Sequence, residues 1–267
     1  MAQVRTDASP PQRWRIPAAL PAPPGAGEAH VWRASLRPPA AELARLEELL
    51  SEDERARAER FRFADQRGGF VVARGVLRTL LGAYLRRDPR EIALETGPYG
   101  KPYLARGAGD PEMRFNLSHA ADLALFAFAP EREVGVDVER TGRAARAAEI
   151  AKRYFAPDEA AFLAALPPVA RAASFVRLWA CKEAYAKATG LGIAGCDLSS
   201  FHVVLDGAAG PAFQGLPGWT LHELPAGEAY VAALAVEGPR VRLRLFEWGD
   251  GAPGASSEGS SLRPRRA

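Results

Sequence analysis

Cysteine and histidine are scarce in this chain, and long apolar runs are absent. Only two of its 267 residues are cysteines, Cys181 and Cys196, and four are histidines. Two thiols are too few for a disulfide framework, and no Cys/His group has zinc-ligand spacing. The first 27 residues hold no apolar run long enough for a signal peptide or a membrane helix. We therefore expect a soluble, cytoplasmic protein without a membrane partner.

A large excess of charge of one sign is also absent. The chain has 35 Lys and Arg against 32 Asp and Glu, a net charge of +3. Part of this excess belongs to Arg263, Arg265 and Arg266 at the very end, so the body of the chain is close to neutral. Because nucleic-acid binding needs a concentrated basic face, we expect no nucleic-acid partner.

Several common catalytic motifs are missing. There is no Walker loop and no Gly-x-Ser-x-Gly elbow. Residues 190–195 have the form of a dinucleotide-binding loop, but they follow a predicted helix instead of a strand, so we interpret them as a helix C-terminus and loop. Cys181 with His119 suggests a thiol nucleophile, but no third group is in place to orient the imidazole, and Cys181 is interpreted as a packing residue.

Proline and small polar residues delimit the folded part. Residues 1–27 are rich in Pro, Ala and Arg, and 251–267 are rich in Gly and Ser, so we predict a flexible N-terminal arm and a disordered tail. Periodicity predicts helices at 39–50, 67–87, 145–154, 157–165 and 169–188, and strands at 29–36, 91–95, 113–116, 123–129, 133–139, 200–205, 218–224, 228–236 and 240–248.

The order of predicted helices and strands repeats in the second half. A shift of 105 residues also places Asp53-Glu54 on Asp158-Glu159 and Phe70-Val71 on Phe175-Val176. The sequence therefore predicts an α+β fold of two similar lobes, residues 28–133 and 134–250, with a ligand-binding cleft between them.

Two short segments carry most of the chemical content. In Gly135-Val136-Asp137-Val138-Glu139, strand period places both carboxylates on one face and the valines on the other. In 179–187, helix period places Trp179, Glu183 and Lys187 on one face. Three carboxylates suit Mg²⁺, and a neighbouring lysine suits a phosphate substrate. Taken singly, each segment is more commonly a solvated strand face or an ordinary helix ion pair.

Two weaker segments precede them. A turn at 99–103 presents Lys101, and it reads by itself as a surface loop. Asn116, Ser118 and His119 end a predicted strand, where backbone amides, a hydroxyl and an imidazole are able to hold phosphate. A single histidine is more often structural.

In this order and near these spacings, Gly-Lys-Pro, Asn-x-Ser-His, Gly-Val-Asp-Val-Glu and Trp-x-x-Lys-Glu-Ala-x-x-Lys resemble the 4′-phosphopantetheinyl transferases. The similar branch is the monomeric, double-lobed type that activates nonribosomal peptide and polyketide synthases. The resemblance covers about residues 50–205. It implies a pseudo-dimer fold, Mg²⁺ as cofactor, coenzyme A as co-substrate and an apo acyl or peptidyl carrier protein as partner.

The resemblance also assigns roles to residues. It implies that Asp137, Glu139 and Glu183 hold the metal, that Glu183 deprotonates the carrier serine, and that Lys187 contacts the pyrophosphate and protonates the leaving group. Lys101, Ser118 and His119 are similar to residues that hold the nucleotide and its 3′-phosphate. Trp179 and Lys182 look structural, with a phosphate contact left open for Lys182.

The sequence departs from the family pattern before the long helix. Gly69 stands where the family commonly has a basic residue or hydroxyl for the 3′-phosphate, and Arg67 or Arg74 is the expected substitute. Two other functions stay open: a Mg²⁺-dependent phosphatase or nuclease, which needs neither Lys187 nor the Ser118-His119 pair, and a non-catalytic binder of coenzyme A or a carrier protein.

Overall fold

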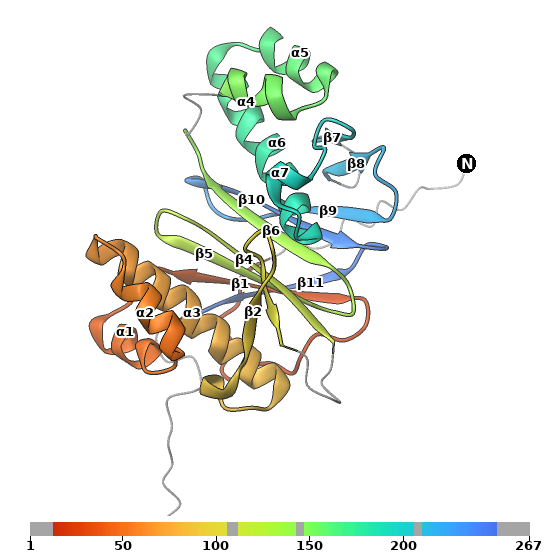
Figure 1. Cartoon of the computed structure of the whole chain (residues 1–267). Helices are drawn as coiled ribbons and strands as arrows, with labels where there is room; N and C mark the ends of the chain where they lie inside the picture. Colours follow the sequence, from red (N-terminus) through yellow and green to blue (C-terminus); the bar gives the residue numbers. More distant parts are fainter. Residues whose placement is uncertain (1–12, 106–111, 143–146, 206–209, 250–267) are drawn as a thin grey trace, which may run out of the picture.

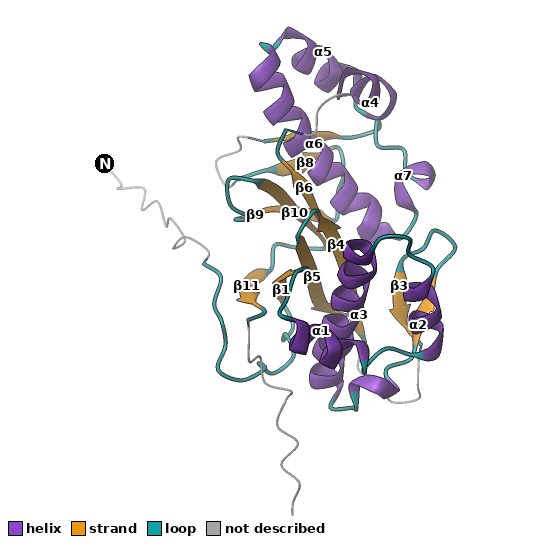
Figure 2. Cartoon of the chain, turned by 90° about the vertical axis from the view of Figure 1, so that its left-hand side faces the viewer, coloured by secondary structure: helices purple, strands orange, loops and turns teal. Residues whose placement is uncertain are grey.

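The structure is a computed structural model that describes residues 13–105, 112–142, 147–205 and 210–249. Two sheets pack between helices α1–α3 at one end and helices α4–α6 at the other (Figure 1, and Figure 2 after a quarter turn). The first half contains β1 (Glu28–Ser35), α1 (Ala40–Glu47), α2 (Glu52–Glu59), α3 (Ala64–Leu85), the 3-10 helix η1 (Pro89–Glu91), β2 (Leu94–Thr96), β3 (Pro102–Leu104), β4 (Met113–Ala120) and β5 (Leu123–Pro130).

The second half repeats this order. It contains β6 (Val134–Arg140), α4 (Ala147–Tyr154), α5 (Pro157–Ala165), α6 (Pro168–Thr189), α7 (Gly192–Gly195), β7 (His202–Val204), β8 (Ala212–Gln214), β9 (Trp219–Leu224), β10 (Tyr230–Glu237) and β11 (Arg242–Glu247). The four-stranded sheet has the strand order β11-β1-β5-β4 and the three-stranded sheet β6-β10-β9, while β2–β3 and β7–β8 form two small two-stranded sheets. Without β11 the two larger sheets have the same order, and the pairs β1–β5 and β6–β10 are both antiparallel. The predicted α+β fold of two similar lobes is confirmed.

Strand alternation separates three apolar cores. One lies between α1–α3 and the first sheet, and another between α4–α6 and the second. The third lies where the two sheets face each other, and the alternating valines of β6, Val134, Val136 and Val138, belong to it. The opposite face of β6, which carries Gly135, Asp137 and Glu139, is therefore turned toward α6, as its period of two requires.

Each lobe is braced by a buried cation on its long helix. Arg78 of α3 donates to Glu54 at the start of α2 at 2.6 Å and to the carbonyls of Pro89 and Ile92 at 3.0 Å each. Lys182 of α6 makes the matching set in the second lobe with Glu159, Leu198 and Phe201. Buried cations need such complete sets of oxygen partners. Lys182 is fully buried in this way, which fits the structural role expected for it.

Two domain predictions need correction. The last strand, β11, was assigned to the second lobe, but it pairs in parallel with β1 of the first sheet. It covers a strand edge that would otherwise stay unpaired. The N-terminal arm is also shorter than the predicted 1–27, because the Trp14 indole donates to the Pro225 carbonyl and Arg15 pairs with Phe246. Residues 1–12 and 250–267, the predicted tail among them, lie outside the described residues.

Among the described residues, α3 is the one helix long and apolar enough in composition to cross a membrane. Of its apolar window, 67% is buried inside the protein. Its apolar side chains belong to the first core, as expected for the central helix of a lobe.

A glycine sets the distance between α6 and β6. A Cβ added to Gly135 would lie 2.1 Å from the Ala184 carbonyl oxygen and 2.3 Å from the Ala188 nitrogen. Both are backbone atoms, so no side chain rotation relieves the clash. Only glycine permits this approach, which brings the carboxylates of β6 next to the helix.

We predict that Gly135→Ala lowers the free energy of unfolding by about 1–3 kcal/mol or more, because an added methyl overpacks this contact. Urea denaturation measures it. Gly68→Ala is the matched control: it is a helical glycine whose added Cβ has no neighbour closer than 3.9 Å. That control gains about 0.5–1 kcal/mol from helix propensity. Equal stability of the Gly135 variant and the parent would contradict the close-approach argument.

Candidate active site

Three elements bring a lysine, a carboxylate and a hydroxyl together. The Lys187 ammonium of α6 lies 2.5 Å from Asp137 Oδ1 of β6 and 2.8 Å from Ser118 Oγ of β4. Ser118 Oγ also donates to Asp137 Oδ1 at 2.9 Å. Glu183, one helical turn before Lys187, has its Oε2 3.7 Å from the same ammonium. The structure therefore gathers four of the residues predicted for the site.

The Asn-x-Ser-His segment joins the two lobes at this point. Asn116 Oδ1 accepts a hydrogen bond from the Val136 amide at 3.0 Å, and Ser118 Oγ accepts one from the Val138 amide at 3.4 Å. These amides belong to the outer edge of β6, which has β10 on its other side. Asn116 and Ser118 thus hold β6 in place. In this structure the Ser118 hydroxyl serves Asp137 and Lys187, while its predicted phosphate contact stays a prediction.

The site carries more negative charge than its own cation balances. Asp137 is 2% exposed, and its Oδ2 atom is buried without a hydrogen-bond partner. Burial, together with repulsion from Asp137, raises the pKa of Glu183 to about 7, although Lys187 offsets part of the rise. Burial lowers the pKa of Lys187, but the attraction of Asp137 and Glu183 outweighs it and the net shift is upward. Lys187 is thus held as a cation beside a carboxyl that is able to take up a proton near neutral pH.

A ready-made metal cage is not present. Within the described residues, no three His, Cys, Asp or Glu side chains are gathered closely enough to hold a metal ion. Two features nevertheless suit a hard dication: Asp137 Oδ2 has no hydrogen-bond partner, and the pKa of Glu183 is raised by burial and by the charge of Asp137. Such an ion would take its remaining oxygen ligands from outside the protein. Substrate phosphate and water supply such oxygens. Glu139 is placed on the same strand face and interacts electrostatically with Glu183.

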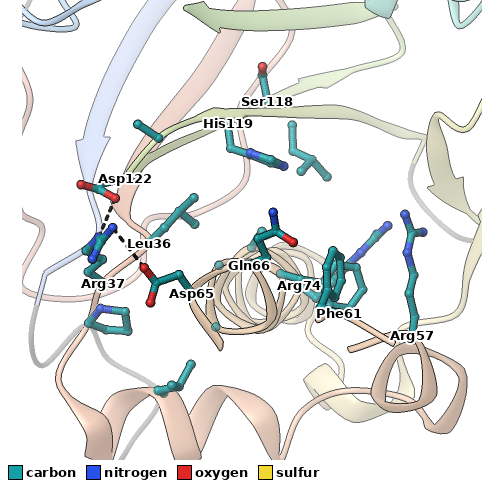
Figure 3. Close-up of a pocket in the computed structure, with 18 of the residues that line it drawn as sticks. Leu36, Arg37, Arg57, Phe61, Asp65, Gln66, Arg74, Ser118, His119 and Asp122 are labelled. Carbon is teal, nitrogen blue, oxygen red and sulfur yellow. Dashed lines mark hydrogen bonds and ion pairs between the residues drawn. The ribbon is translucent and has the colours of Figure 1, made fainter. Parts of the chain in front are cut away.

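A pocket of about 1060 Å³ opens beside this group. Most of its wall comes from the first lobe, and Lys187 is its contribution from the second. Ser118 and Lys187 belong both to the pocket wall and to the carboxylate group. The side chains that the close-up labels are Leu36, Arg37, Arg57, Phe61, Asp65, Gln66, Arg74, Ser118, His119 and Asp122 (Figure 3). Through Ser118 and Lys187, the pocket wall therefore adjoins the carboxylates of Asp137 and Glu183.

Two basic groups gather at one end of the pocket. Arg57 and Arg74 lie together there, away from Arg37, which is ion-paired with Asp122 (Figure 3). Both guanidiniums contact the Phe70 ring, with centroid distances of 5.2 and 5.7 Å. Arg74 is also 4.0 Å from Glu54. This end of the pocket suits a phosphate group, since guanidinium binds phosphate oxygens in pairs.

His119 lines the same pocket. Burial, followed by the nearby charge of Lys187, lowers the pKa of this imidazole. It is therefore mostly neutral at pH 7 and is able to donate one hydrogen bond, and a bound phosphate would favour its protonation.

The pocket wall differs from the predicted set of residues. Arg67 forms an ion pair with Glu47 and is not part of the pocket wall. Arg74 lines the pocket, so it is the better candidate for the basic residue that the family commonly has at the position of Gly69. Lys101 is also absent from the wall, and its ammonium lies against Glu133 and the end of α6. Arg57 was missed, because α2 is charged around its whole circumference and no periodicity singles out one arginine.

We predict that Glu183→Gln becomes more stable relative to the parent as pH rises. The ordinary carboxyl pKa of 4.5 is raised to about 7 in the folded protein. The stability linked to this proton is fully present below the unfolded pKa and is lost as pH rises through the folded pKa. The glutamine variant has no proton to release at this position, so it does not lose this stability as pH rises. Unfolding in metal-free buffer at about pH 5 and about pH 8 measures the difference. Exposed Glu59, changed to Gln, is the control; a difference for Glu183 that does not vary with pH would contradict the assignment.

Comparison with known proteins matches most of the chain to one family. A family model described as the 4′-phosphopantetheinyl transferase superfamily matches residues 133–235, and one for the N-terminal part of these transferases matches residues 34–131. The chain is 40% identical over 223 residues to the 4′-phosphopantetheinyl transferase HetI of Nostoc sp., which covers 82% of this chain and 93% of that protein. A phosphopantetheinyl transferase of Thraustochytrium sp. is 37% identical over 211 residues, covering 73% and 72%. The chain therefore belongs to the 4′-phosphopantetheinyl transferase family of enzymes.

Proposed function

We propose that this transferase moves the 4′-phosphopantetheine group of coenzyme A onto a serine of an apo acyl or peptidyl carrier protein, with Mg²⁺. One observation carries the proposal: Lys187 belongs both to the wall of the large pocket and to the buried carboxylate group. A substrate whose nucleotide fills the pocket has its pyrophosphate beside Lys187. The phosphate under attack is then next to Glu183.

The residues suit the two proton movements of the reaction. The carrier serine attacks the phosphorus that bears the pantetheine arm, and the bond to the bridging oxygen breaks, which releases adenosine 3′,5′-bisphosphate. Glu183, with a pKa of about 7, accepts the serine proton. Lys187 faces the oxygen that takes up negative charge, and it stabilises that charge or donates a proton to it.

The buried carboxylates also suit the metal. Asp137 and Glu183 would hold Mg²⁺, with Glu139 on the same strand face, and the ion would supply charge neutralisation at the pyrophosphate. The partnerless Oδ2 of Asp137 supports this assignment. Action as a monomer in the cytoplasm, without nucleic acid or membrane, stays a prediction.

The test incubates the protein with coenzyme A, Mg²⁺ and an apo carrier protein, and the carrier is then weighed by mass spectrometry. We expect the carrier to gain one phosphopantetheine, and Asp137→Asn to lose this activity by roughly 100-fold or more, because a hard dication loses an anionic ligand. The variant should also lose the rise in melting temperature that Mg²⁺ gives the parent. Cleavage of coenzyme A with an unchanged carrier mass would favour a phosphatase, and binding without either change would favour a non-catalytic binder.

A second prediction separates nucleotide recognition from chemistry. His119→Ala should raise the KM for coenzyme A far more than the KM for dephospho-coenzyme A, because the latter lacks the 3′-phosphate that charge-assisted hydrogen bonds would hold. Arg74→Met should show the same preference. Arg67→Met is the matched control, since Arg67 is paired with Glu47 outside the pocket wall. Equal effects of the His119 change on both substrates would remove His119 from the 3′-phosphate.

A further inference from the structure

Lys101 occupies a different place from the phosphate-binding role that the family resemblance implies. It follows the turn between β2 and β3, and its side chain is 15% exposed. Its ammonium donates to Glu133 Oε2 at 2.8 Å and to the Ala188 carbonyl at 2.7 Å, and the Val134 carbonyl is 3.5 Å away. A lysine ammonium has three N–H donors, and these three oxygens account for all of them. None is left for a phosphate.

The Ala188 carbonyl belongs to the last turn of α6. Such carbonyls lack partners within the helix and need others. At this helix end the Thr189 hydroxyl donates to the Ala186 carbonyl at 3.0 Å, and the Gly190 amide donates to the Lys187 carbonyl at 3.3 Å. Lys101 supplies the partner for Ala188, and its positive charge complements the negative end of the helix dipole.

The fit around the lysine stem is equally specific. A Cβ on Gly190 would lie 3.4 Å from Lys101 Cδ, which is van der Waals contact, so the lysine stem packs directly against this residue. The φ of +73° at Gly190 favours glycine. On the other side of Lys101, Gly100 and Pro102 line the large pocket. Lys101 therefore links the pocket wall of the first lobe to the helix turn that carries Lys187.

We infer that Lys101 is a positioning residue for the transfer reaction: it fixes the last turn of α6, and with it Lys187, against the turn at 97–101 that forms part of the pocket wall. This inference rests on the proposed function. It differs from a 3′-phosphate contact in its consequences, because a misplaced Lys187 affects transfer from any donor, with or without that phosphate.

The test compares Lys101→Met with Arg114→Met in the full chain. Arg114 is the matched control, because its Nε lies 3.4 Å from the other oxygen of Glu133 and, among the described residues, its ion pairs are with Glu133 and Glu112. We expect Lys101→Met to lower kcat by roughly tenfold with coenzyme A and dephospho-coenzyme A alike, because small displacements of catalytic groups are costly. Its ratio of the two KM values should stay that of the parent. Arg114→Met should leave kcat within about twofold, as expected for a partly exposed ion pair.

Hydrogen exchange gives a second readout that needs no activity. Amides of the last turn of α6 should exchange faster in Lys101→Met than in the parent and in Arg114→Met. A KM rise confined to coenzyme A, or an unchanged kcat with unchanged exchange, would overturn the inference. If the parent transfers nothing, the proposed function fails, and exchange alone still decides whether Lys101 holds the helix end. Lys101→Gln replaces the methionine variant if that variant does not fold.

Discussion

The close approach of α6 to β6 at Gly135 is the constraint on which the site depends. Backbone atoms of α6 lie so near that a single added Cβ would overlap them. At this separation the ammonium of Lys187 lies 2.5 Å from Asp137 Oδ1 and 2.8 Å from Ser118 Oγ. The same contact buries Asp137, which leaves one of its oxygens without a partner and pushes the pKa of Glu183 upward. One steric fact thus produces both the geometry and the electrostatics.

The two lobes fill equivalent positions with different side chains. The shift of 105 residues places Trp32 of β1, which lies opposite Phe126, at the position of Asp137 of β6, which lies opposite Ala233. Trp32 is buried and donates to Tyr84 of α3, so the first lobe fills the corresponding space with core. The bounds of α3 and α6 superpose with a shift of 104 residues, one fewer than the shift of 105 that aligns the few sequence identities. With the shift of 104, Arg78 corresponds to Lys182 and Thr79 to Glu183. The first lobe supplies most of the pocket wall, and the second supplies the carboxylates and Lys187.

Local periodicity was sufficient to predict much of this. Alternation on β6 predicted that the valines and carboxylates face opposite ways, and helix period placed Glu183 and Lys187 on one face. The repeated order of elements predicted two lobes, because local patterns survive duplication even where few identities remain. These features depend on residues that are close together in the sequence, so they can be predicted from local periodicity.

The features that escaped prediction depend on contacts between distant segments. The pairing of β11 with β1 is set by an open strand edge more than 200 residues away in the chain. Arg67 and Arg74 lie two turns apart on the same face of α3. They differ in what lies next to them, because Glu47 of α1 pairs with Arg67 while Arg74 lines the pocket. The same holds for Lys101. A lysine in a turn is predicted to be solvent-exposed, and its contact with the end of α6 depends on a segment far away in the sequence.

The most direct measurement of the central claim is a crystal structure with coenzyme A and Mn²⁺, whose anomalous signal locates the metal. We predict a peak beside Asp137 Oδ2 and Glu183, the pyrophosphate within hydrogen-bond distance of Lys187, and the 3′-phosphate near Arg57, Arg74 and His119. A metal bound away from Asp137, or a nucleotide outside the pocket that Lys187 lines, would contradict the claim that Lys187 joins the donor pocket to the carboxylates.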